Sequence, residues 1–207
     1  MLTLDTHTLV IFLARWVHFL AGITWIGMLY FFNLVNVHFG KILDADTKKK
    51  VVPELMPRAL FWFRWGAMFT FLSGLLIIYW KLWVATQAGL WGDGGLFTTS
   101  WGQWITFGAA LGTIMWFNVW FVIWPAQKKI IRWVKAGESP PEMAGLVKRA
   151  ALISKINAFL SVPMLFGMGA ASHFPMVNHW VFVVVLVVGF AIAHLTIKAS
   201  AKVITAV

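Results

Sequence analysis

The sequence has no cysteine and only seven acidic residues among its 207 residues. Without cysteine the chain forms no disulfide, thiolate metal site or iron–sulfur cluster, and it attaches no c-type haem covalently. Charged residues make up 12% of the chain, about half the share in an average soluble domain, whereas hydrophobic residues make up 60%. A soluble fold of this size would lack the polar surface to cover its core. The composition therefore predicts an integral membrane protein.

Long stretches of the chain carry no Lys, Arg, Asp or Glu, and each is long enough for a helix of about 20 apolar residues that crosses a bilayer. The last stretch, residues 156–197, has room for two helices and is interrupted near its middle by residues 173–175. We therefore predict an all-α fold, in which residues 1–207 form a single membrane bundle of about five transmembrane helices. The predicted spans are residues 14–38, 60–83, 104–125, 152–172 and 179–198.

The basic residues are distributed unevenly between the two sides of this bundle. Fifteen of the 17 Lys and Arg residues lie in or beside two alternate connections and the C-terminal tail, whereas the other side keeps only Arg15 and Lys81. This is the positive-inside pattern. It predicts a multi-pass protein with its N-terminus outside and its C-terminus in the cytoplasm. The run of lysines at 48–50 is then explained by topology and anionic lipid, with no nucleic acid partner.

Among the ionisable residues, histidine is the one that occurs at similar depths in different predicted spans. No acidic residue lies inside a span, which argues against a proton pump or a cation transporter. His18 and His173 lie near the outer ends of two spans, and His38 and His194 lie near inner ends. Two imidazoles from different helices at one depth are what a b-type haem requires. Arg15 shares a helix face with His18 and is suited to hold a haem propionate. Interfacial hydrogen bonding is the alternative role for each histidine.

Several further residues inside the spans predict close contacts between helices. Buried amides in a membrane usually form interhelical hydrogen bonds, and Gly108 and Gly112 permit close helix packing. Pro163 is expected to kink the fourth span. The amides concerned are Asn33, Asn36, Asn118 and Asn157.

Three blocks of this sequence resemble the membrane domain of the PuuD-type urate oxidases, also called urate hydroxylases. The first block is RWVH at 15–18 followed by AGITWIGMLYFFN at 21–33. The second is NVWFVIWPAQK at 118–128, and the third is NAFLSVPMLF at 157–166 with SHFP at 172–175. The order of the blocks agrees with that family.

A looser resemblance links the first span to the HemJ and CopD membrane families. The shared pattern is His18, then Trp25 and Gly27, then Tyr30. HemJ-type proteins are haem-binding protoporphyrinogen oxidases, and CopD-type proteins handle copper. This resemblance supports His18 as a ligand position.

The urate oxidase resemblance implies an oxidoreductase of the bacterial inner membrane that passes substrate electrons to a c-type cytochrome. Combined with the histidine pattern, it predicts a membrane-embedded oxidoreductase that binds haem b, with His18 and His173 as ligands of the haem iron. The same resemblance also implies urate or a related purine as substrate. PuuD-type proteins carry a c-type cytochrome domain, but a chain without cysteine implies that a separate c-type cytochrome or another acceptor takes the electrons. Two alternatives stay open. One is a non-catalytic anchor or assembly subunit of a respiratory complex, and the other is a CopD-like copper transport protein.

Overall fold

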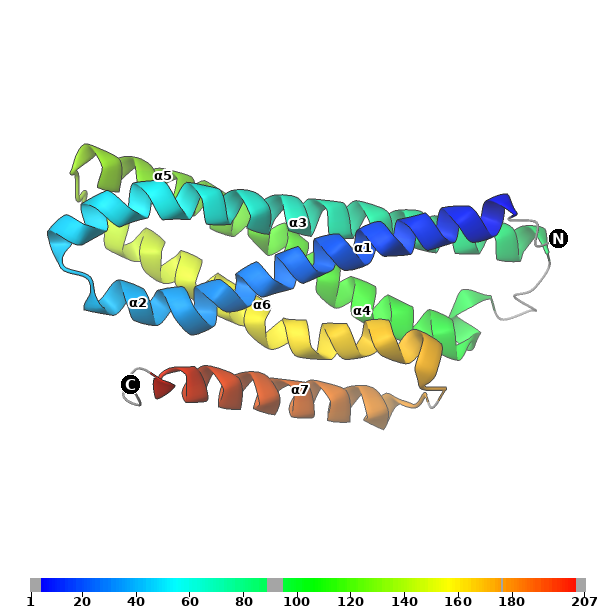
Figure 1. The fold of residues 1–207 in the computed structure, drawn as a ribbon. Coiled ribbons are helices and arrows are strands. Elements are labelled where there is room, and N and C mark those ends of the chain that lie inside the picture. The colour runs from blue at the N-terminus through cyan, green and yellow to red at the C-terminus, as the bar shows by residue number, and fades with distance from the viewer. Residues whose placement is uncertain (1–4, 89–94, 176, 204–207) are drawn as a thin grey trace.

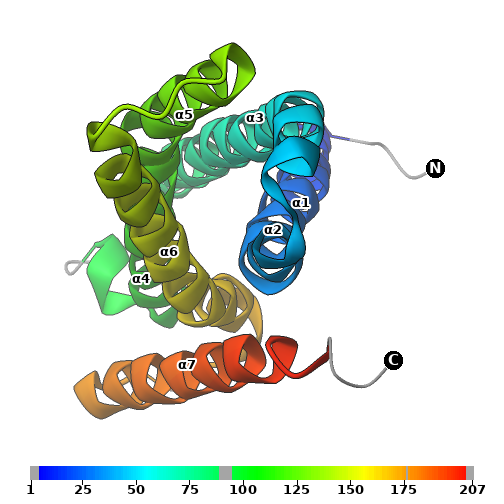
Figure 2. The same cartoon turned by 90° about the vertical axis from the view of Figure 1, so that its left-hand side faces the viewer.

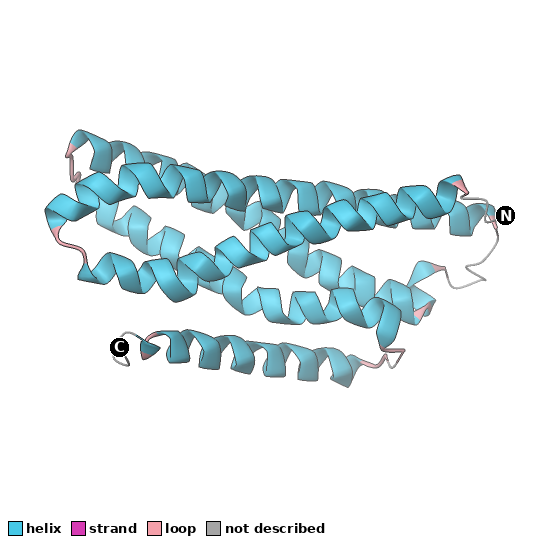
Figure 3. Ribbon diagram, in the orientation of Figure 1, coloured by secondary structure: helices cyan, strands magenta, loops and turns pink. Residues whose placement is uncertain are grey.

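A computed structural model describes residues 5–88, 95–175 and 177–203, which form helices and contain no strand (Figure 3). Within these ranges five helices are long and apolar enough to cross a membrane. Each contains one predicted span, so the prediction of an all-α bundle with five spans is confirmed. The chain is a multi-pass membrane protein, whereas the orientation of its termini stays a prediction.

The first three spanning rods are built from seven helical segments. The first rod joins α1 (Thr6–Tyr30), the π-helical η1 (Phe31–Asn36) and α2 (Val37–Ile42). The second is α3 (Ala45–Gln87), and the third begins with α4 (Ser100–Phe117). The third rod continues through the π-helical η3 (Asn118–Ile123) into α5 (Trp124–Ala136).

Two single helices complete the bundle. They are α6 (Glu142–His173) and α7 (His179–Ser200). A short 3₁₀ segment, η2 (Leu96–Thr98), precedes α4. We use "basic end" for the end of the bundle that holds the α2–α3 and α5–α6 connections and the end of α7. Residue 5 lies at the opposite end (Figure 1).

The α3 helix starts well before the predicted span at residues 60–83. Asp44 caps it, because the Asp44 carboxylate accepts hydrogen bonds from the backbone nitrogen and the hydroxyl of Thr47. The helix then continues past Pro53 and Pro57. A segment that the sequence suggested as a connection is therefore a rigid part of the second rod.

Small residues set the closest approaches between helices. A side chain at Gly66 would meet the backbone of Trp25 at 3.0 Å, so α1 and α3 lie in close contact there. The backbone around Gly167 lies about as close to Gly108, as the small-residue pattern on the third span predicts. Viewed from the basic end, the rods surround a central region, and α7 lies along one side of α6 (Figure 2).

Aromatic and aliphatic side chains fill the centre of this bundle. Trp25, Leu29, Phe63, Met115 and Val119 are each at most 2% exposed. They come from α1, α3, α4 and η3, so they join the first three rods. Many large apolar side chains instead point outward, as expected for helices whose solvent is lipid. Examples include Ile23, Phe69, Leu152, Trp180, Val187 and Leu195.

Two π-helical segments interrupt the rods, and near each of them an asparagine side chain donates a hydrogen bond to a backbone carbonyl. In η1, Asn33 Nδ2 donates to the Leu29 carbonyl at 2.8 Å. Beside η3, Asn157 Nδ2 donates to the Met115 carbonyl at 3.0 Å. Pro125 follows η3 and lacks an N–H, which deprives the carbonyl four residues earlier of its usual partner. Wide turns of this kind are frequent at functional sites.

Candidate functional site

His18 lies half-buried on α1 with its ring against α3. Its Nδ1 lies 3.2 Å from the Ser73 hydroxyl oxygen. Gly74 makes this approach possible, because a methyl group there would lie 3.1 Å from His18 Cε1. The partner of His18 could not be predicted from the sequence, since Ser73 is 55 residues away.

The hydrogen bonds around Ser73 favour one tautomer of His18. The single hydroxyl hydrogen of Ser73 goes to a backbone carbonyl of its own helix, Phe69 or Thr70. The Ser73 oxygen therefore accepts a hydrogen bond, and His18 Nδ1 carries the donated hydrogen. This leaves a lone pair on Nε2. A histidine that ligates iron commonly has this arrangement, in which the non-ligating nitrogen is held by a hydrogen bond.

His173 is the exposed last residue of α6, and within the described residues no hydrogen bond or ring contact joins it to His18. A hydrogen bond of 3.0 Å joins the hydroxyl groups of Tyr30 on α1 and Ser161 on α6. Each histidine lies twelve residues beyond this bond, away from the basic end. Twelve residues correspond to about 18 Å of helix. Beyond the Tyr30–Ser161 bond, away from the basic end, α1 runs beside α3 whereas α6 runs toward α7, so α1 and α6 diverge (Figures 1 and 2).

Two cations lie near the same end of the bundle as this pair. Arg15 is exposed one turn before His18. The charge of Arg15 acts electrostatically on Lys81 of α3, whose ammonium also lies 4.5 Å from the centre of the Trp101 ring. Arg15 and Lys81 together give this end of the bundle a local positive charge, which favours the binding of a carboxylate or another anion.

The inner histidines are arranged differently. His38 Nε2 lies 3.1 Å from the hydroxyl of Ser200, which donates its own hydrogen to the Ile197 carbonyl. His38 therefore carries its hydrogen on Nε2. His194 is exposed and lies six residues, about 9 Å of helix, before Ser200. His38 is thus at the depth of Ser200 rather than that of His194, and a cofactor role for these two residues stays a prediction.

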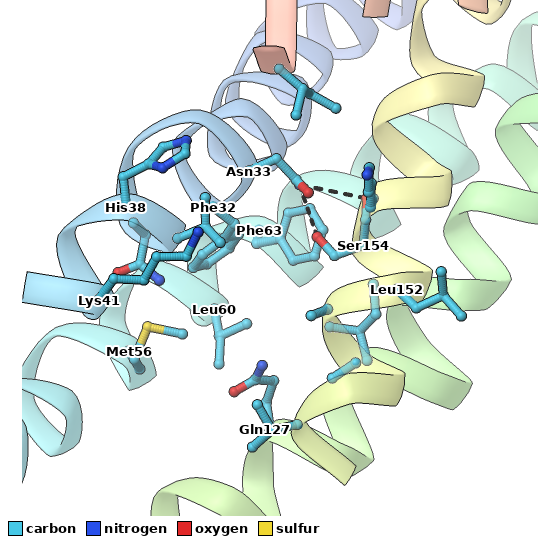
Figure 4. Close-up of a pocket in the computed structure, with 18 residues that line it drawn as sticks. Phe32, Asn33, His38, Lys41, Met56, Leu60, Phe63, Gln127, Leu152 and Ser154 are labelled. Carbon is cyan, nitrogen blue, oxygen red and sulfur yellow. Dashed lines mark hydrogen bonds between the residues drawn. The ribbon is translucent and has the colours of Figure 1, made fainter. Parts of the chain in front are cut away.

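The predicted interhelical amide bonds are confirmed for three of the four asparagines. Asn33 donates to the Ser154 hydroxyl at 2.9 Å (Figure 4), and Asn118 donates to Asn157 Oδ1 at 2.8 Å. Asn157 is completely buried. Asn36 makes no such bond within the described part of the chain and instead lines a cavity at the basic end.

That cavity is the feature that sequence reasoning missed. It measures about 430 Å³ and takes Lys41 and Lys155 among its lining residues. The positive-inside pattern explains on which side of the membrane the two lysines lie. It does not explain why both line the same cavity. The available signal was that each lysine lies within five residues of an asparagine on the same helical rod: Lys41 follows Asn36, and Lys155 precedes Asn157.

The described residues contain no group of three or more His, Asp or Glu side chains arranged to hold a metal ion. A bis-histidine haem requires only two protein ligands. The two histidines predicted at the outer end, His18 and His173, lie on helices that diverge there, with Arg15 and Lys81 near the same end.

Comparison with known proteins shows a family to which this chain is similar. Residues 90–204 match the family described as urate oxidase N-terminal, and this range covers 115 of the 207 residues. It includes the second and third blocks of resemblance and His173, but not the first block with His18. No curated protein and no solved structure matches the chain significantly. Since the match spans more than half of the sequence, the chain belongs to the urate oxidase N-terminal family.

Proposed function

We propose that this chain is the haem-b-binding membrane unit of a urate oxidase-type oxidoreductase in a bacterial inner membrane. Its substrate is urate or a related purine, and a separate c-type cytochrome accepts the electrons. Family membership supports the urate oxidase assignment. The observation that supports the haem assignment is the hydrogen bond between His18 Nδ1 and Ser73, which favours the tautomer with a lone pair on Nε2.

In this proposal each residue of the outer site has a separate task. His18 and His173 would hold the haem iron, and Ser73 would keep the His18 ring in the ligating tautomer. Arg15 and Lys81 stabilise the negative charge of propionates or of an anionic purine. Haem b, when bound, supplies one-electron redox chemistry, for which the chain needs no dedicated acid or base.

The orientation of the chain is part of the same proposal. Positive-inside distribution puts the basic end in the cytoplasm and the His18–His173 end outside. A purine and a c-type cytochrome would then meet the protein from the outer side. A cysteine-accessibility assay with single cysteines at positions 5 and 139 tests this directly, because only the outer one should react with a membrane-impermeant maleimide in intact cells.

The visible spectrum of the protein, purified in detergent after expression with ample haem supply, tests the haem assignment. We expect a Soret band that shifts on reduction with dithionite. His18→Ala and His173→Ala should each bleach the band or convert it to a high-spin form. His179→Ala is the matched control, since His179 is also exposed near that end, and it should leave the band unchanged.

The contrary results are equally clear. A colourless protein contradicts the haem assignment and favours an anchor or assembly subunit. Stoichiometric copper without iron favours a CopD-like role. A haem that survives both alanine variants contradicts the outer site. The reaction is tested by adding urate to the oxidised protein, measuring reduction of the haem, and then adding a c-type cytochrome to reoxidise it. A haem that urate does not reduce contradicts urate as the substrate.

A further inference from the structure

The cavity at the basic end lies between four rods of the bundle. Side chains from η1 and α2, α3, α5 and α6 line it, and Ile197 of α7 completes the wall (Figure 4). Its volume of about 430 Å³ falls within the range of small-molecule sites. This site is separate from His18 and His173 and does not depend on the proposed function.

Two amide side chains in the wall have no hydrogen-bond partner within the described part of the chain. They belong to Asn36 and Gln127, and both side chains are half-buried. In contrast, the neighbouring Asn33 and Ser154 bond to each other at 2.9 Å. These two amides are therefore available to form hydrogen bonds with a polar group in the cavity.

The charges around the cavity have one sign. Lys41 and Lys155 line it, and no Asp or Glu is among its lining residues. A smaller adjoining pocket of about 140 Å³ shares Asn36 and Gln127 and adds Lys48. The polar group that suits this wall is consequently an anion, because ammonium groups and amide N–H groups all donate hydrogen bonds.

The rest of the wall is apolar. Phe32 and Phe63 meet edge to face, with ring centroids 5.3 Å apart, and Met56 and Leu60 lie beside them. A small inorganic anion would leave this surface uncovered. A ligand with both an anionic head and an apolar body would cover it and gain the hydrophobic contribution of burial.

We propose that this cavity binds an anionic amphiphile. Lys41 and Lys155 hold its phosphate or carboxylate head, Asn36 and Gln127 donate hydrogen bonds to that head, and its apolar part lies against Phe32 and neighbouring side chains. Such a ligand has two sources, an anionic membrane lipid or a soluble organic anion of the same chemistry.

Calorimetric titration of the full chain in an uncharged detergent tests this proposal. The probes are octyl phosphate, dioctanoyl phosphatidylglycerol and inorganic phosphate, with octyl glucoside as the uncharged counterpart. We expect saturable binding of at least one of the two anionic amphiphiles, weaker binding of inorganic phosphate and none of octyl glucoside. Preference for the phosphatidylglycerol identifies a lipid site, whereas preference for octyl phosphate identifies a soluble ligand.

The variant Lys41→Gln with Lys155→Gln should weaken binding of the amphiphile roughly 30-fold, since each cation near a membrane surface contributes a factor of about five. The matched control is Lys128→Gln with Lys129→Gln, which removes two exposed charges at the same end outside the cavity. It should bind as the parent does. If the double variant at 41 and 155 fails to fold, Asn36→Ala provides the test, with about fivefold weaker binding for one lost hydrogen bond.

Three results would overturn the proposal. One is the absence of binding for both anionic amphiphiles. Another is an equal loss in the Lys128/Lys129 control, which would reduce the effect to general surface charge. The last is binding of inorganic phosphate as tight as that of the amphiphiles, which would show that the apolar wall does not contribute to ligand binding.

Discussion

Asn118 in η3 donates a hydrogen bond of 2.8 Å to Oδ1 of Asn157 in α6, and Asn157 donates in turn to the carbonyl of Met115 at 3.0 Å. The completely buried Asn157 side chain thus links α6 to both a side chain and the backbone of the third rod. Such a link fixes the height of α6 relative to the π-helical turn.

Asn157→Leu should therefore destabilise the protein by about 1–3 kcal/mol, because the Asn118 amide and the Met115 carbonyl lose a buried partner. Thermal unfolding in detergent measures the effect. Asn36→Leu is the control, since Asn36 has no hydrogen-bond partner among the described side chains, and its cost should be much smaller. Equal losses in the two variants would show that the amide network contributes nothing specific.

Gly189 provides a second test of helix packing. A methyl group at this position would lie 2.8 Å from Pro163 Cδ and 3.1 Å from its backbone nitrogen, and the rigid proline ring cannot turn away. Gly189→Ala should separate α7 from α6 at a cost of about 1–3 kcal/mol. At Gly169, which has open space, the same change should stabilise the helix by about 0.5–1 kcal/mol. Opposite signs in thermal unfolding are therefore expected, and a stabilising effect at both positions would contradict the close contact.

Gly74→Ala tests the setting of the His18 ring. The new methyl group would lie 3.1 Å from Cε1, so the imidazole must move by a few tenths of an ångström. In the haem-loaded protein this should shift the absorption bands or the reduction midpoint. Gly27→Ala on the same helix as His18 meets nothing within 4 Å and should leave both unchanged. Identical spectra and midpoints in the two variants would show that His18 does not ligate the haem.

Asp44 predicts a pH dependence of stability. Hydrogen bonds from the Thr47 side chain and backbone lower the pKa of the exposed Asp44 carboxyl below its ordinary value. Because the folded pKa lies below the unfolded one, the cap contributes fully above the unfolded value near 4 and is lost as the pH falls through the folded pKa.

The measurement is the midpoint of thermal unfolding between pH 7 and pH 3. Asp44→Ala should unfold at a lower temperature than the parent at pH 7, and the gap should close at low pH. Asp44→Asn keeps an uncharged acceptor, so its loss relative to the parent should be smaller. A gap that stays constant with pH would mean that the carboxylate charge does not stabilise α3.

The hydropathy of the chain predicted the five rods well, because a bilayer demands about 20 apolar residues for each crossing. The early start of α3 escaped prediction. Its first turns are polar and contain two prolines, so no apolar period marks them, and only the Asp44–Thr47 cap signals the helix. The interhelical amides were predictable because a membrane leaves a buried amide few other partners.

Pairing within the site was far less predictable. The equal twelve-residue spacing of His18 and His173 depends on the Tyr30–Ser161 bond, which joins residues 131 positions apart. The attachment of His38 to Ser200 is equally distant in sequence. A single sequence specifies which face of a helix is polar, but it does not specify which neighbouring helix that face meets.

The length of α3 has a consequence for the side of the membrane at which it begins. Its 43 residues extend for about 65 Å, roughly twice the thickness of the hydrocarbon layer. The fifteen residues before its apolar part, 45–59, form a stem of about 22 Å. Lysines 48–50 lie on this stem, so their three positive charges are held on a helix rather than on a loop.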